Sequence, residues 1–267
     1  MPSSAAQLLR FRGLLATLTG REIKARYRGS VLGSFWSLVN PLLLLAVYSV
    51  VFGFVFRRPV GGATEPYALF LIAGLFPWIW ASSSLLEGTL ALTANAPLLR
   101  KAVFPGELLP VVPVLANLLH LLLALPVLAA ALAAGRWLGY PVGGWGALWL
   151  PAVLALQLPM LAGLALGLAA LHAHFKDVRD LLANLLTLLF FLAPILYPLS
   201  AVPFRPLRVL VAANPFTPFT LAYQATLFAG AAPPPALWLQ MAAWAALFWL
   251  AGSWLYGRLR ETVVEAV

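Results

Sequence analysis

The sequence contains no cysteine, which excludes disulfides, cysteine metal sites and thiol nucleophiles. Charge is also scarce, since Asp, Glu, Lys and Arg together make up 9% of the 267 residues. The three lysines neither follow a glycine nor precede a serine or threonine, so the Gly-Lys-Ser/Thr loop that cradles nucleotide phosphates is missing. The chain therefore does not hydrolyse ATP by that route.

Hydrophobic residues, by contrast, make up 63% of the chain, and the mean hydropathy is +0.93. A soluble domain of this length cannot bury so much apolar surface, so we expect an integral membrane protein. The net charge of +9 does not indicate nucleic acid binding, because the basic residues are scattered at the ends of apolar runs. We expect their partners to be membrane lipids with anionic headgroups.

The stretch at residues 21–45, REIKARYRGSVLGSFWSLVNPLLLL, joins a basic segment to a long apolar one. The basic part is predicted to be an amphipathic interface helix at the lipid headgroups, with the cations Arg21, Lys24, Arg26 and Arg28. No charge follows from residue 29 to residue 56, which is long enough to cross a membrane. A signal peptide is the alternative, but this run is too long, starts too far into the chain and is followed by no small-residue cleavage site.

Six apolar runs reach the length of a membrane-spanning helix, at residues 31–56, 66–86, 108–134, 145–171, 181–202 and 237–256. Backbone groups in lipid must bond within their own segment, and these runs are too long and too evenly apolar for barrel strands. The predicted fold class is therefore all-α. It consists of a cytoplasmic arm at residues 1–30, a six-span permease domain at residues 31–256 and a cytoplasmic tail at residues 257–267.

The charges in the loops orient these spans. Six spans place both termini on one side, and twelve of the 17 Lys and Arg residues fall on that side. The other five are Arg57, Arg58, Arg136, Arg205 and Arg208. Because cytoplasmic loops carry the excess of Lys and Arg, both termini are predicted to be cytoplasmic.

Residues 203–235 do not fit a simple span. They hold two short apolar pieces, at residues 207–213 and 219–228, which are separated by Asn214-Pro215 and Thr217-Pro218. A residue before a proline is pushed out of the helical region, so a re-entrant helical hairpin that dips into the outer leaflet is predicted. A seventh, kinked span is the alternative, but it would place the cationic tail outside and weaken the charge asymmetry.

Two predicted cytoplasmic loops, NAPLLRKAVFPGELLP at residues 95–110 and HAHFKDVRDLL at residues 172–182, are too short to fold as domains. Both carry more charge than a connection requires. They are either ordinary positive-inside anchors or a docking surface for a cytoplasmic partner.

Candidate catalytic or metal-binding groups are few. His172 and His174 lie near two aspartates, but residues two apart point to different sides of a helix, so no metal site is expected. No Ser/His/Asp set or carboxylate pair can be placed on one face, and no catalytic residue is expected. Ionisable groups within apolar runs are functional candidates unless a neighbouring helix bonds them, and they are His120 in the third span and Glu87 at the inner end of the second.

In chain order, the sequence contains VLGSFWSLVNPL, LFLIAGLFPWIWASSS, NAPLLRKAVFPGELLP, HFKDVRDLLANLLTLLFFLAPILYP and NPFTPFTLAYQ. Together these motifs resemble the membrane-spanning subunit of ABC-type polysaccharide exporters, the permeases for O-antigen, capsule polysaccharide and teichoic acid. The resemblance covers roughly residues 8–256. Gly106 departs from the pattern of that family, which usually has a charged residue between the proline and Glu107.

The resemblance implies a permease without a cofactor of its own. Two copies would pair with two copies of a separate ATPase, which binds ATP and Mg²⁺, and would export a lipid-linked polysaccharide across the bacterial cytoplasmic (inner) membrane. ATPase coupling is expected at Arg21, Lys24, Arg28, Leu99, Arg100, Lys101, Phe104, Pro105 and Glu107. The translocation channel is expected to use Asn214 and aromatic rings that stack on sugars, namely Phe76, Trp78, Trp80, Phe190, Phe191, Tyr197, Phe216 and Phe219.

Two alternative functions are compatible with the sequence. A drug or small-lipid exporter would share this architecture and would differ in the width of the channel. A membrane-embedded glycosyl or acyl transferase belongs to another class. The sparse acids within the spans argue against it, since such enzymes place carboxylates or histidines around a cavity.

Overall fold

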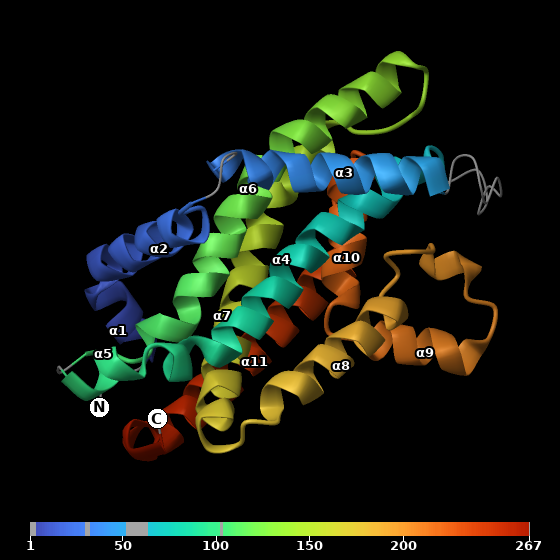
Figure 1. Ribbon diagram of the computed structural model, residues 1–267. Helices are drawn as coiled ribbons and strands as arrows, with labels where there is room; N and C mark the ends of the chain where they lie inside the picture. The colour runs from blue at the N-terminus through green and yellow to red at the C-terminus, as the bar shows by residue number, and fades with distance from the viewer. Residues whose placement is uncertain (1–3, 30–32, 52–63, 102–103, 267) are drawn as a thin grey trace.

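The computed structural model of the chain describes residues 4–29, 33–51, 64–101 and 104–266. Across these residues every regular element is helical (Figure 1), which confirms the predicted all-α class. The main helices are α1 (Ser4–Arg10), α2 (Arg12–Arg26), α3 (Trp36–Val50), α4 (Tyr67–Ala94), α5 (Ala96–Lys101), α6 (Leu108–Trp137), α7 (Leu150–His174), α8 (Val178–Leu192), α9 (Arg205–Ala213), α10 (Thr217–Tyr223) and α11 (Pro235–Ala266).

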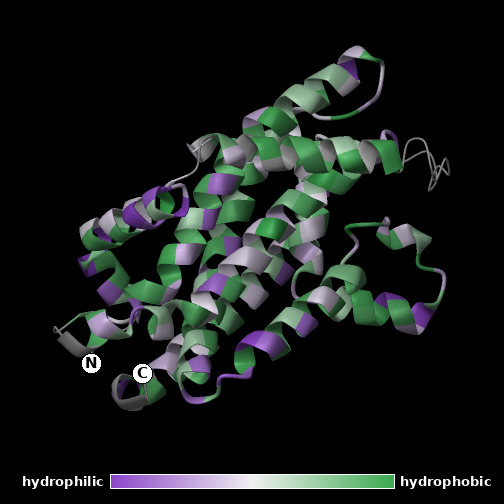
Figure 2. Ribbon diagram, viewed as in Figure 1, coloured by the Kyte–Doolittle hydropathy of each residue, from purple (hydrophilic) through white to green (hydrophobic). Residues whose placement is uncertain are grey.

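Among the described residues, four helical segments are long and apolar enough to cross a membrane. They cover residues 67–94, 108–137, 145–174 and 235–263, and they correspond to the second, third, fourth and sixth predicted runs. Figure 2 shows hydrophobic colour along these helices and hydrophilic colour on α2 and at the turn between α7 and α8. Helix α11 continues to Ala266, so most of the predicted tail extends the last span as helix.

The first and fifth predicted runs form shorter helices. Helix α3 has 15 residues, and residues 31–32 and 52–56 of the first run lie outside the described part of the chain. The fifth run is not one continuous helix, because α8 ends at Leu192 and Ala193 is extended, with ψ of 142°. The proline at position 194 explains this end, since the residue before a proline avoids the helical region. The count of six spans therefore stays a prediction.

Residues 205–228 form a helix, a break and a second helix, as the proline pattern predicts. Asn214, before Pro215, is extended with ψ of 124° and ends α9. Helix α10 then continues into a π-helical turn, Gln224–Phe228, and most of this second limb is buried. In α9, by contrast, Val211 is the buried residue. The position of the hairpin relative to the lipid leaflets stays a prediction.

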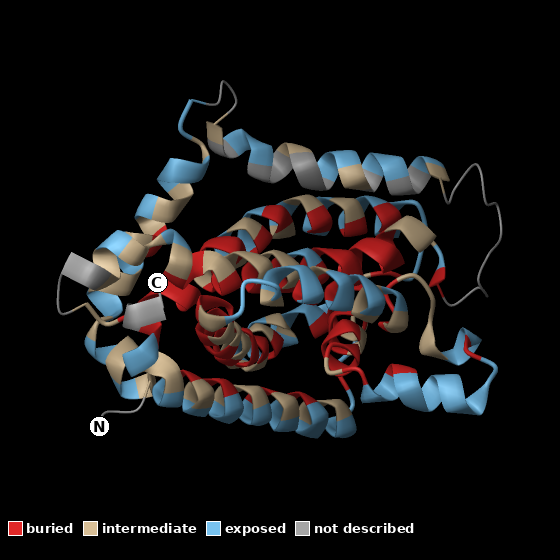
Figure 3. Ribbon diagram, turned by 60° about the horizontal axis from the view of Figure 1, so that its bottom comes forward, coloured by how far each residue is buried: buried red, intermediate tan, exposed pale blue. Residues whose placement is uncertain are grey.

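Buried residues are concentrated between the long helices (Figure 3), while α3 and the α8–α9 segment flank the centre and expose their outer faces. Most of α4 is buried, because α6, α7, α8 and α10 all pack against it. Among the described helices, α7 and α11 form the most extensive packing contact. The large core lies among these elements, and a smaller second cluster near the ends of α4, α7 and α11 includes Leu92, Leu166 and Tyr256.

The two ends of the bundle hold different parts of the chain. Helix α1, helix α5, the α7–α8 turn and the end of α11 gather at one end (Figure 1). At the other end, the N–H of Gly143 donates to the carbonyl oxygen of Phe228 at 2.8 Å, and that of Gly146 donates to Gly230 at 3.0 Å. Gly143 and Gly230 both have positive φ, 69° and 64°, which favours glycine at these positions. These bonds fasten the end of the buried α10 limb to the loop before α7.

Candidate functional site

The basic N-terminal helix α2 lies beside α6 and turns different residues outward and inward. Arg21, Lys24 and Arg28, three of the predicted coupling residues, are exposed. On the inner side, Thr19 is buried and Leu15 packs against the smaller core cluster. The described part of α2 thus exposes cations, but its inner side holds the polar Thr19 beside Leu15, and apolar residues do not gather strongly on one face. The amphipathic character of this helix is therefore weaker than predicted.

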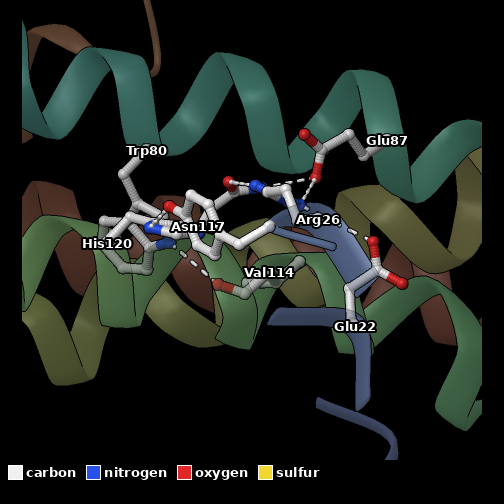
Figure 4. Close-up of polar contacts among 8 residues, drawn as sticks. Glu22, Arg26, Trp80, Glu87, Val114, Asn117 and His120 are labelled. Atoms are coloured by element: carbon white, nitrogen blue, oxygen red, sulfur yellow. Dashed lines mark hydrogen bonds and ion pairs between the residues drawn. The ribbon is translucent and has the colours of Figure 1, made fainter. Parts of the chain in front are cut away.

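Arg26, the last residue of α2, is also partly exposed, but its guanidinium binds two other helices (Figure 4). Its Nη2 donates to Glu87 Oε2 of α4 at 2.7 Å, and its Nη1 donates to Asn117 Oδ1 of α6 at 2.8 Å. Asn117 Nδ2 closes the triangle by donating to the same Glu87 oxygen at 2.8 Å. Glu22, one turn earlier on α2, lies 3.8 Å from the Arg26 guanidinium. The three helices are therefore joined by one ion pair and two amide hydrogen bonds.

Neighbouring side chains extend this polar cluster along α6. The hydroxyl of Tyr27 and Nδ1 of His120 share a hydrogen bond of 3.1 Å, and the two rings meet edge to face with centroids 5.6 Å apart. On α6, one turn before Asn117, the carbonyl oxygen of Val114 accepts a hydrogen bond of 3.0 Å from Trp80 Nε1 of α4. His120, which sequence analysis left open, thus bonds a neighbouring element.

The placement of Glu87 differs from the prediction in one respect. Helix α4 continues to Ala94, so Glu87 lies well inside the helix and not at its inner end. A carboxylate at such a position in a membrane helix is expected to have a charged or polar partner. Arg26 and Asn117 fill that role. Sequence analysis placed Arg26 among the cations of the interface helix without predicting this contact, and it did not single out Asn117. The available signal was that Arg26 follows Leu15, Thr19 and Glu22 at helical spacing.

The first predicted cytoplasmic loop, with α5, borders a groove of about 570 Å³ at the end of the bundle that holds α1. The groove is lined by loop residues, by α1 and Phe11, and by the last turns of α11, namely Gln7, Arg10, Phe11, Leu99, Phe104, Pro105, Gly106, Glu107, Tyr256, Arg260, Glu261 and Val263. Leu99 and Phe104 are half-buried, and Glu107 is 8% exposed. The side chains of Arg100 and Lys101 lie outside the described part. The structure thus brings the predicted loop and the N-terminal arm together and adds α11.

Tyr256 explains why glycine fits at position 106. A Cβ atom added at Gly106 would lie 2.6 Å from Tyr256 Oη, so the tyrosine hydroxyl occupies the space that a larger side chain at this position would need. Tyr256 itself is buried in the smaller core cluster. The departure at Gly106 is therefore matched by a large side chain from α11.

The predicted channel residues are mostly buried in this single chain. Trp78 is the centre of an aromatic group, with ring centroids 5.2 Å from Phe216 and 5.7 Å from Phe190. Phe191 is exposed, and Phe190 and Tyr197 are half-buried. The buried members are Phe76, Trp78, Trp80, Asn214, Phe216 and Phe219. Their assignment to a channel stays a prediction.

Asn214 has a structural role that the sequence did not reveal. Its Nδ2 donates to the carbonyl oxygen of Leu189 in α8 at 2.9 Å, and its Oδ1 accepts from the backbone N–H of Phe216 at 3.0 Å. These bonds satisfy the backbone at the break between α9 and α10 and tie the break to α8. Gln224 similarly donates to the carbonyl oxygen of Pro194 at 2.8 Å.

The histidines of the second loop lie in the last turn of α7. His172 is buried, while His174 bonds Thr262 of α11 through Nε2 at 2.9 Å. Among the described residues, no group of three or more His, Cys, Asp or Glu side chains gathers in a way that could hold a metal ion. In this structure His174 connects the loop to α11.

Comparison with known proteins places this arrangement of helices in a family. The sequence signature of the family described as "ABC-2 type transporter" matches residues 13–228, from the start of α2 to the end of the buried α10 limb. The chain belongs to the ABC-2 type transporter family. As a member of it, the chain is a membrane transport subunit.

Several relatives of this ABC-2 member are known by function. The O-antigen export system permease protein RfbA of Myxococcus xanthus is 36% identical over 263 residues, which is 98% of each chain. A protein of the same name from Klebsiella pneumoniae is 32% identical over 217 residues, 79% of this chain and 78% of its own. The polysialic acid transport protein KpsM of Escherichia coli is 24% identical over 184 residues, 68% of this chain and 69% of its own.

Proposed function

We propose that the chain is the permease half of an ATP-driven exporter that moves a lipid-linked polysaccharide, of the O-antigen, capsule or teichoic acid class, across the cytoplasmic membrane. One observation carries the proposal, namely the similarity to an O-antigen export permease over 98% of both chains. A relative named for polysialic acid transport supports the polysaccharide class and favours it over drugs or small lipids.

A separate ATPase would supply the energy, because this sequence lacks a phosphate-binding loop. The docking face for that ATPase would combine the exposed cations Arg21, Lys24 and Arg28 with the groove beside Phe104. Cations steer an approaching partner, whereas buried aromatic anchors contribute most of the binding energy. The clustering of α1, the loop and α11 at one end supports this assignment.

The channel would form between two copies of the chain. Six of the nine predicted channel residues are buried within one copy, so a path for a glycan requires movement of the α8–α10 segment or a second chain. Helix α8 exposes Leu181, Leu185, Leu188 and Phe191 along one face. We infer that this face borders the second copy and the translocation path, with Phe190 and Trp78 directly behind it.

The orientation follows from the charges. The end with α1, the first loop and the α7–α8 turn carries the excess of Lys and Arg, so it would face the cytoplasm of the bacterial cell. The end with the Gly143–Phe228 bond would face outward.

Co-expression with the partner ATPase in a strain that lacks its own permease tests the proposal. We expect the chain to copurify with the ATPase and to restore polysaccharide at the cell surface. Phe104→Ala should abolish export and weaken copurification while leaving membrane insertion intact, because Phe104 is half-buried at the docking groove. Phe204→Ala, at an exposed phenylalanine of the segment before α9, is the matched control and should export normally. Normal export by Phe104→Ala would show that the first cytoplasmic loop is not part of the docking face.

A further inference from the structure

We propose that Arg26 is a positioning residue, which fastens α2 to α4 and α6 through Glu87 and Asn117 and passes movement of α2 to these two spans. The proposal rests on the proposed function, because such movement matters only where an ATPase acts on α2. It assigns a role to Glu87, the carboxylate within the second span.

The geometry of the contact favours transmission of movement over simple attachment. Arg26 uses two nitrogens of its planar guanidinium on two different helices, at 2.7 Å to Glu87 and 2.8 Å to Asn117. Because the guanidinium fork is rigid, it sets the orientation of its acceptors as well as their distance. The Asn117–Glu87 bond of 2.8 Å then holds α4 and α6 to each other, so all three helices meet at one point.

A second contact fastens the same end of α2. Tyr27 bonds His120, which lies three residues beyond Asn117 on the same face of α6. The fastened end thus engages two successive positions of α6, while Arg21 and Lys24 on the same helix are exposed. A partner that binds the exposed cations would therefore pull on a helix whose end is fixed to two spans.

The environment makes the pair costly to separate. The side chains of Arg26 and Glu87 are 26% and 39% exposed, and they lie against membrane helices, where an unpaired charge is expensive. Moving α2 alone would leave the Glu87 carboxylate without its cation and with only the Asn117 amide as a partner, so α4 and α6 are expected to follow α2. Glu22 offers Arg26 an alternative acceptor on its own helix, 3.8 Å away, if the cross-helix pair does open.

Charge-removing variants test this role in the assembled complex of permease and ATPase in proteoliposomes. Arg26→Gln and Glu87→Gln should keep ATPase copurification and ATP hydrolysis, but glycan exported per ATP should fall roughly two- to thirtyfold. The double variant Arg26→Gln with Glu87→Gln should export better than either single variant, because it removes both charges of the pair between the helices and leaves neither of them unpaired. Arg12→Gln, an exposed cation at the start of α2, is the matched control and should match the unaltered chain.

Arg26→Lys provides a milder variant in case charge removal prevents folding. Lysine keeps the positive charge but lacks the planar pair of donors with which Arg26 bonds two helices. Glycan exported per ATP should therefore fall while the amount of folded protein stays normal. Unaltered export per ATP in Arg26→Lys and Glu87→Gln, or an equal loss in Arg12→Gln, would overturn the proposal.

A measurement on the permease alone separates this proposal from the proposed function. Because the chain has no cysteine, spin labels can be attached at Ala25→Cys on α2 and Leu119→Cys on α6, both of which are exposed. Arg26→Gln should broaden the distance distribution between the labels, and the double variant should narrow it again. An unchanged distribution in Arg26→Gln would contradict the fastening even if export is observed. Fastening without any export by the unaltered complex would instead contradict the proposed function.

Discussion

Gly163 on α7 and Gly252 on α11 bring these two helices into direct backbone contact. A Cβ atom added at Gly252 would overlap the carbonyl oxygen of Gly163, and one added at Gly163 would overlap that of Phe248. Small residues at such contacts are the main means by which membrane helices approach closely, since lipid tails provide no hydrophobic force between helices. Close packing at these two glycines therefore holds α11, the last predicted span, against α7, the fourth.

Replacing Gly252 by alanine should destabilise the bundle. We expect a loss of about 1–3 kcal/mol, because neither backbone can move without disturbing the rest of the contact. Gly257→Ala, on the same helix and with nothing within 4 Å of its added Cβ, is the matched control and should be neutral or slightly stabilising. Thermal unfolding in detergent measures both variants. Equal melting temperatures for the two would show that α7 and α11 are not in close contact.

A second pair of variants tests the fit between the first loop and α11. Gly106→Ala should lower thermal stability, because the new methyl group would lie 2.6 Å from Tyr256 Oη. Adding Tyr256→Phe removes that oxygen, so the double variant should recover stability relative to Gly106→Ala. If the second substitution instead adds its own loss in full, Tyr256 does not limit the size of residue 106.

The buried hydrogen bond between Tyr223 and Gln157 fastens α10 to α7. The Tyr223 hydroxyl donates to Gln157 Oε1 at 2.6 Å. Tyr223→Phe should cost about 1–3 kcal/mol, because it leaves a buried amide oxygen without its donor. Combining it with Gln157→Leu should cost less than the sum of the single variants. Strictly additive losses in thermal unfolding would show that the two side chains do not interact.

The topology can be mapped with single cysteines, since the chain has none of its own. Lys176→Cys and Arg258→Cys should react only with reagents that reach the cytoplasm, and Trp145→Cys and Ala231→Cys should react from outside. All four side chains are exposed. Labelling of position 258 from outside would contradict the six-span arrangement and favour seven spans.

Four of the spans could be predicted because length and apolar content are local properties of the sequence. The segments at residues 67–94 and 108–137 begin within a residue of the prediction. The fifth run could not be predicted in this way. The run is uncharged and mostly apolar, but Pro194 ends α8 early, and the carbonyl oxygen of Pro194 accepts a hydrogen bond from Gln224. Hydropathy does not report such tertiary bonds.

The site was harder to predict for a similar reason. Among the four cations at residues 21–28, only the helical spacing of Arg26 with Leu15 and Thr19 sets it apart in the sequence, and in the described structure it alone among them bonds α4 and α6. Which cation makes such bonds depends on acceptors that lie far away in the chain. Trp80 and Asn214 were predicted as channel residues, which stays a prediction, and no pattern in the sequence indicated that both also bond backbone carbonyls in the packed bundle.

Transport by a purified system tests the central claim most directly. The chain and its partner ATPase would be reconstituted into vesicles with the ATPase facing outward, and lipid-linked polysaccharide would be added to the outer leaflet. We expect ATP and Mg²⁺ to move the glycan into the vesicle lumen, where an added glycan-degrading enzyme cannot reach it, and we expect no hydrolysis or transport by the permease alone. Protection of the glycan that does not depend on ATP, or ATP hydrolysis without any protection, would contradict the proposed function.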